Sequence, residues 1–132
     1  MNREIKFRAW NTDDKEMHEV KSLYFGENDY QKVAENLNKK GNHDSFYGKD
    51  GNSILMQFTG LKDKNGVKIF EGDLIKHETK QISVVNWSEG DWGWWMRSIK
   101  DWNPKTVFDS SKDEIIGNIY ENPELLPPTQ EV

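Results

Sequence analysis

Turn signals recur at short intervals through the second half of this chain and separate short runs of apolar and β-branched residues. Asn-Gly is the strongest short-range hairpin signal, because both residues readily adopt positive φ. Strands joined by such turns pair antiparallel, so we expect a mainly β protein: a small antiparallel barrel of about five strands between residues 54 and 120. We assign structural turn roles to Asn65, Gly66, Gly72 and Asp73, and we expect Asp73 to accept hydrogen bonds from turn amides.

The first 53 residues carry a mixed pattern. Residues 4–10 alternate apolar and polar side chains, which predicts a half-buried strand, and residues 17–25 are its expected partner in a hairpin. Residues 41–52 are rich in Gly, Asn, Asp and Ser, and we expect a mobile loop interrupted by Phe46 and Tyr47. One amphipathic helix is predicted from an apolar stripe at i, i+3, i+4 and i+7, formed by Tyr30, Val33, Ala34 and Leu37.

Length and composition favour one lean domain. The chain has 132 residues, of which 34% are hydrophobic and 31% charged. We expect a single domain over residues 1–126, with strands, helix and loop in 1–53, a barrel in 54–120 and a flexible tail in 127–132. Aromatic side chains make up 12% of the chain, and we expect them to supply much of the core. Self-association would supplement so lean a core, which makes a homo-oligomer an expectation.

The charge and cysteine content point to a compartment and disfavour some partners. The net charge is −5, with no broad basic surface in either half, so non-specific phosphate binding is disfavoured. The chain has no Cys, which favours a reducing, cytoplasmic location. No apolar run is long enough for a membrane helix, and the charged first residues do not resemble a signal peptide.

Three blocks of sequence resemble the YopX family of phage and prophage proteins. They are residues 4–10 (EIKFRAW), residues 56–75 (MQFTGLKDKNGVKIFEGDLI) and residues 116–125 (IGNIYENPEL). The resemblance implies a cytoplasmic protein of a bacterial host and a mainly β fold similar to a Src homology 3-like barrel with additions. It implies no established activity and no catalytic residues.

The candidate reactive groups do not form a known site. His18, His43 and His77 lack metal-ligand spacing, and His77 and Glu78 would point to opposite faces of a strand. Residues 110–113 (SSKD) lack a placed base that would activate a serine nucleophile. A calcium loop through residues 61–72 fails because Leu61 and Gly72 would occupy its first and last ligand positions. We therefore expect no catalytic residues, no metal and no cofactor.

Tryptophan is concentrated in one segment, where five of the six Trp lie between residues 87 and 102. Three interpretations stay open: a core with cross-strand aromatic pairs, a protein interface including self-association, or a surface that stacks nucleic-acid bases beside cations. The acidic residues Glu89, Asp91 and Asp101 weaken the last. The candidate partner-binding residues are Trp92, Trp94, Trp95, Arg97 and Trp102.

These features predict a non-enzymatic binding or assembly module that acts through protein–protein contacts, either with itself or with a phage or host protein. The alternative is a nucleic-acid-binding accessory or regulatory protein that uses a Trp-rich barrel face. The acidic charge disfavours that alternative.

Overall fold

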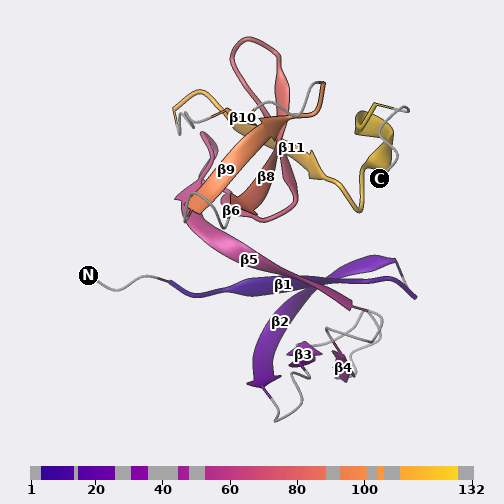
Figure 1. The fold of residues 1–132 in the computed structure, drawn as a ribbon. Coiled ribbons are helices and arrows are strands. Elements are labelled where there is room, and N and C mark those ends of the chain that lie inside the picture. The colour runs from indigo at the N-terminus through magenta and orange to yellow at the C-terminus, as the bar shows by residue number, and fades with distance from the viewer. Residues whose placement is uncertain are drawn as a thin grey trace. The chain divides into compact units, whose positions relative to one another are not determined.

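The computed structural model describes residues 4–13, 15–25, 31–35, 45–47, 53–88, 93–100, 104–105 and 111–127. Within them the chain forms eleven strands and one short 3-10 helix, which is a mainly β architecture. The chain divides into two compact units, Met1–Gln57 and Phe58–Val132. Strand β5 (Ser53–Lys62) runs from the first unit into the second (Figure 1). In the described part, no helix is long and apolar enough to span a bilayer.

The first unit is an antiparallel sheet whose strands follow the order β4-β3-β2-β1-β5 (Figure 1). Ala9 is fully buried, and the partly buried Val20, Leu23 and Leu55 pack against it. The hairpin predicted from the alternation in residues 4–10 and from the partner strand at residues 17–25 is therefore present in the structure. The strands are β1 (Phe7–Asn11), β2 (Glu16–Phe25), β3 (Gln31–Glu35), β4 (Ser45–Tyr47) and the first half of β5.

The predicted amphipathic helix is wrong where the structure describes it, because Gln31–Glu35 form strand β3. Val33 lies opposite Leu23 of β2 and opposite Phe46 of β4, so β3 has neighbours on both sides. Pairing with two strands outweighs a weak helical periodicity, and β-branched Val33 suits a strand better than a helix. Tyr30, Leu37 and most of the predicted loop 41–52 lie outside the described residues, whereas Phe46 and Tyr47 of that loop belong to β4.

The second unit contains a five-stranded antiparallel sheet of order β10-β9-β8-β7-β11, together with the β5–β6 hairpin. The predicted strands of residues 54–120 reappear with small shifts of their ends, as do the predicted turns at residues 62–66 and 71–73, whereas the predicted turn at residues 88–91 falls largely outside the described residues. The elements are the second half of β5, β6 (Lys68–Phe70), β7 (Asp73–Lys76), β8 (Ile82–Ser88), β9 (Gly93–Ser98), β10 (Pro104–Lys105), β11 (Glu114–Asn118) and η1 (Pro123–Leu125).

The predicted small barrel is not closed within the described residues, because the strands form two antiparallel sheets whose described edge strands do not pair with each other. A barrel closes only when its edge strands pair with each other. Here β10 has two residues and pairs with β9, whereas β11 at the opposite edge pairs with β7. Strand β6 has three residues and pairs with β5 alone among the described strands.

The five-stranded sheet is covered on both faces, which explains the continuous apolar runs in its central strands. On one face, Ile75 and Val85 pack with Ile69 of β6. On the other face, Leu74 and Val84 pack with a C-terminal group that includes Leu125. Neighbouring residues of one strand thus serve opposite cores, as the period of two requires.

The buried core of the described residues is mainly aliphatic. The expectation that aromatic rings supply much of the core stays a prediction, because most aromatic side chains lie outside the described part. Among the described residues, the buried aromatic side chains are Phe58 and Phe70, with ring centroids 5.6 Å apart. The other buried hydrophobic side chains are Ala, Met, Ile, Leu and Val. Trp87 retains 45% of its surface exposed.

Candidate functional site

The tryptophan segment forms the β8–β9 hairpin at its described positions. Trp87 on β8 lies opposite Trp94 on β9, one pair before the Ser88–Gly93 pair at the end of the ladder. Nearer the base of the hairpin, Val85 lies opposite Met96, and both are buried in the core. The hairpin is therefore anchored in the core at its base and carries the exposed Trp87 indole at its far end.

The structure describes three of the five candidate partner-binding residues. Trp94 and Trp95 lie on β9, where the backbone register sets Trp95 opposite Asn86. Arg97 is half-buried on the same strand, opposite Val84 on one side and Pro104 on the other. Trp92 and Trp102 lie outside the described residues. Trp87 was not among the candidates, although its exposure makes it the described indole best placed to meet a partner.

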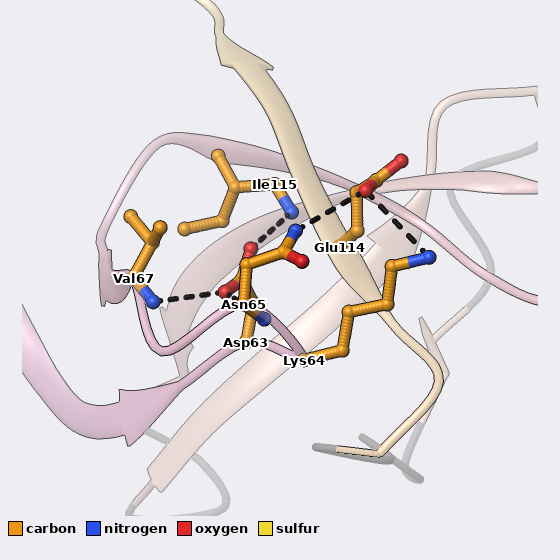
Figure 2. Close-up of polar contacts among 6 residues, drawn as sticks. All are labelled: Asp63, Lys64, Asn65, Val67, Glu114 and Ile115. Carbon is orange, nitrogen blue, oxygen red and sulfur yellow. Dashed lines mark hydrogen bonds and ion pairs between the residues drawn. The ribbon is translucent and has the colours of Figure 1, made fainter.

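Asp63 organises the predicted Asn65-Gly66 turn (Figure 2). Its Oδ1 accepts hydrogen bonds from the backbone N–H groups of Asn65 and Val67, each at 2.9 Å. Its Oδ2 accepts from the backbone N–H of Ile115 on β11, at 3.0 Å. Gly66 adopts φ +80°, a left-handed conformation that glycine adopts at little cost. The carboxylate is thus occupied by amides and ties the β5–β6 turn to β11.

The environment of Asp63 favours its ionised form. Burial acts to raise the pKa of this carboxyl, since only 5% of the residue is exposed. The amide donors of Ile115, Val67 and Asn65, helped by the charge of Lys64, outweigh burial and hold the pKa of Asp63 below its usual 3.8. Asp63 therefore stays ionised across the neutral and mildly acidic range.

The second turn also binds its neighbours through the main chain. Gly72 has φ +87°, donates its N–H to the Val85 carbonyl at 2.9 Å, and accepts from the Ile119 N–H at 3.0 Å. Asp73, 1% exposed, accepts the Phe70 N–H on Oδ2 at 2.7 Å. Gly72 and Asp73 therefore position β6, β7, β8 and the end of β11.

A line of three polar side chains lies between β7, β8 and β11. The His77 Nδ1 lies 3.1 Å from Oδ2 of Asp113, and its Nε2 lies 2.9 Å from Oγ of Ser83. This is the order of groups in a serine nucleophile triad. Ser83, however, has no exposed surface, so its hydroxyl is not presented to a substrate. The line instead joins the β7–β8 turn, β8 and the residue before β11, and it fixes the orientation of the His77 ring.

Sequence reasoning missed this line and misplaced His77. His77 follows β7 in the turn before β8, so the strand rule that set His77 and Glu78 on opposite faces does not apply to them. Both residues line the same open hollow of about 400 Å³. Asp113 belongs to residues 110–113, which were not expected to form a nucleophilic site because no base is near them in sequence. The histidine that Asp113 contacts is distant in sequence.

The hollow, which we call the lysine hollow, lies beside the β7–β8 turn and the start of β11. Two of its walls are ion pairs: Lys64 Nζ lies 3.6 Å from Glu114 Oε2, and Lys112 Nζ lies 3.2 Å from Glu78 Oε2. Lys76 and Lys80 complete its lysine lining. Among the described residues, no group of three or more His, Cys, Asp or Glu side chains is arranged to hold a metal ion.

Comparisons with known proteins identify relatives at the level of family and fold. A family model described as "YopX protein" matches residues 6–127. The crystal structure of protein EF1440 from Enterococcus faecalis is similar, with a TM-score of 0.69 and 28% sequence identity. The similarity covers 96% of this chain and 100% of that one. No curated protein matches the sequence.

Proposed function

We propose that this chain, which belongs to the YopX family over residues 6–127, is a non-enzymatic binding or assembly module that acts through protein–protein contacts. The observation that carries the proposal is the exposure of Trp87 at the end of the β8–β9 hairpin. A half-exposed indole on a strand leaves a large apolar surface in water, and Trp is enriched among residues that dominate binding energy.

The construction of the hairpin supports a contact role. Val85 and Met96 anchor it in the core two residue pairs from Trp87, so the indole projects from a rigid support. A rigid anchor loses little conformational entropy on binding, which favours affinity. The partner in this proposal is a second copy of the chain or a phage or host protein.

Several finer expectations belong to the same proposal. The family resemblance supports a phage or prophage origin, a cytoplasmic location and a Src homology 3-like relationship for the second unit. The absence of a catalytic role is proposed on the burial of Ser83, whose hydroxyl contacts His77. A homo-oligomer is proposed because self-association would cover the exposed indole.

The test combines light scattering with capture from a host lysate. Size-exclusion chromatography with light scattering measures the mass against 15.5 kDa for one chain. Immobilised protein then reports retained partners from a lysate of phage-carrying cells. The proposal expects a mass above that of one chain, or a partner retained in proportion to the bait. A strict monomer that retains nothing would count against it.

The alternative is a nucleic-acid-binding accessory or regulatory protein, proposed because Arg97 lies in the tryptophan segment, although it pairs with Val84 and so lies on the hairpin face opposite to that of Trp87. Aromatic rings beside cations stack bases of single strands. Titration of tryptophan fluorescence with single- and double-stranded oligonucleotides tests this function. Salt-dependent quenching is expected if the alternative holds, and the absence of quenching rejects it.

A further inference from the structure

The lysine hollow has a local charge opposite to that of the whole chain. Glu114 and Glu78 are occupied by Lys64 and Lys112, whose ion pairs form two of its walls. Lys76 and Lys80 also line it, and both are exposed. Among the described residues, neither of these two lysines has an acidic partner within ion-pair distance. Four lysines against two glutamates give the lining an excess of positive charge on a protein of net charge −5, although Glu114 lies opposite Lys76 in the β7–β11 ladder and Asp113 lies behind His77.

Lys80 occupies a backbone position that does not suit lysine. The turn is closed by two hydrogen bonds, His77 N–H to the Gln81 carbonyl and Lys80 N–H to the His77 carbonyl, both at 2.8 Å. Lys80 has φ +71°, in the left-handed region. Gly and Asn are the usual residues at such a position, because a longer L side chain crowds the backbone there. The backbone conformation at residue 80 therefore disfavours lysine, and yet Lys80 is the residue that lines the hollow there.

The floor of the hollow is fixed. Both ring nitrogens of His77 are engaged, by Asp113 and by Ser83, so the imidazole is held in place and is not free to bind a ligand directly. A ligand would contact the flexible ammonium groups of Lys76 and Lys80 against this fixed floor. Flexible ammonium groups select a ligand by its charge, whereas a planar guanidinium group also selects it by fixed hydrogen-bond geometry.

We propose that the lysine hollow binds the phosphoryl group of a small phosphorylated molecule. A phosphate monoester carries close to two negative charges near neutral pH, which suits a lining in which lysines outnumber glutamates. A volume of about 400 Å³ accommodates a phosphoryl group with part of the molecule that carries it. Lys64 and Lys112 also line the hollow, where each is held in an ion pair with a glutamate.

The test is a titration followed by amide chemical shifts in NMR at low ionic strength. The probes are inorganic phosphate, AMP and adenosine, each added to the full chain up to millimolar concentration. Phosphate and AMP are expected to shift the amides of residues 76–81 and 111–114 and to lose affinity as salt is added. Adenosine, which lacks the phosphoryl group, is expected to leave those amides unchanged. Absence of shifts with phosphate and AMP, or equal shifts with adenosine, would overturn the proposal.

A matched pair of variants separates binding from folding. Lys80→Asn removes one positive charge from the lining and places a residue that tolerates φ +71°, so the melting temperature is expected to hold or rise while AMP affinity falls about tenfold. Lys15→Asn is the control, because Lys15 is also an exposed lysine with positive φ, +55°, and does not line the hollow. Lys15→Asn is expected to change the melting temperature in the same direction as Lys80→Asn and to leave the AMP affinity unchanged. Equal affinity for wild type and Lys80→Asn would overturn the proposal.

Discussion

The most informative single change in this fold is Asp63→Asn. It preserves the size and shape of the side chain and removes its charge. The carboxylate accepts three backbone hydrogen bonds, from Asn65, Val67 and Ile115, and only 5% of the residue is exposed (Figure 2). An amide has one acceptor oxygen and one NH₂ group, so in either orientation the NH₂ faces at least one of these N–H donors.

The magnitude follows from counting these bonds. A hydrogen bond to a charged group contributes about 1.5–3 kcal/mol, and a buried donor left without a partner costs about 1–3 kcal/mol. Asp63→Asn loses the bond on one oxygen and converts the others to weaker neutral bonds. Part of the loss is recovered by water, because Asn65 and Val67 are themselves exposed. We expect the free energy of unfolding to fall by about 2–4 kcal/mol at pH 7.

Urea unfolding followed by circular dichroism measures this loss, and its pH dependence tests the cause. The folded pKa of Asp63 lies below its ordinary value of 3.8, so its stabilisation is complete well above that pH. The stabilisation is lost as the pH falls through the lower folded pKa. The difference between wild type and Asp63→Asn should therefore shrink on acidification below about pH 4.

Glu124→Gln is the matched control, because it makes the same chemical change at an exposed residue of η1. Its free energy of unfolding should stay within about 0.5 kcal/mol of wild type. The reasoning would be refuted by an Asp63→Asn protein as stable as the control, or by a difference that does not change between pH 7 and the acid range.

Two further predictions concern the second unit. Gly117→Ala should lower the free energy of unfolding by about 1–3 kcal/mol, because the new Cβ would lie 2.7 Å from Cγ of Asn122; urea unfolding against wild type checks this. Gly60→Ala meets no atom within 4 Å, so its loss of about 1–2 kcal/mol should come from its left-handed φ of +91° alone. A double-mutant cycle of His77→Ala and Asp113→Ala should give a coupling energy of about 0.5–3 kcal/mol in the same assay, and additive losses would show that the brace between β7 and β11 is not energetically real.

Much of the sheet architecture follows from local sequence patterns. The alternation in residues 4–10 and the Asn65-Gly66 and Gly72-Asp73 turns predict strands that the structure contains, because tight turns restrict how neighbouring strands pair. The barrel did not follow, since closure depends on pairing between edge strands that no local signal encodes.

The helix prediction failed for a related reason. Val33 and Ala34 fit an i, i+3, i+4, i+7 stripe, but the same residues also fit a strand once β2 and β4 offer their backbone groups. Four apolar residues are too few to distinguish the 3.6-residue period of a helix from the two-residue period of a strand. Pairing with distant segments decided the outcome.

The polar sites show the same limit more strongly. Asp63 lies two residues before the predicted Asn65-Gly66 turn, but its bond to Ile115 joins segments that are far apart in sequence. The contacts of His77 with Ser83 and Asp113 carry no motif spacing, so only the fold brings them together. Composition located the tryptophan segment, but only the structure shows that Trp87 on β8 is exposed while the nearby Val85 is buried.

The most direct test of the proposed function compares two exposed apolar residues of the second unit. Trp87 is 45% exposed on β8, and Leu61 is 47% exposed on β5. Immobilised wild type, Trp87→Ala and Leu61→Ala are assayed for retention of the bound protein, whether a second copy or a lysate partner. We predict that Leu61→Ala retains it like wild type and that Trp87→Ala weakens binding by at least about thirtyfold, as loss of a dominant contact residue does. Equal retention by Trp87→Ala and wild type would contradict the account.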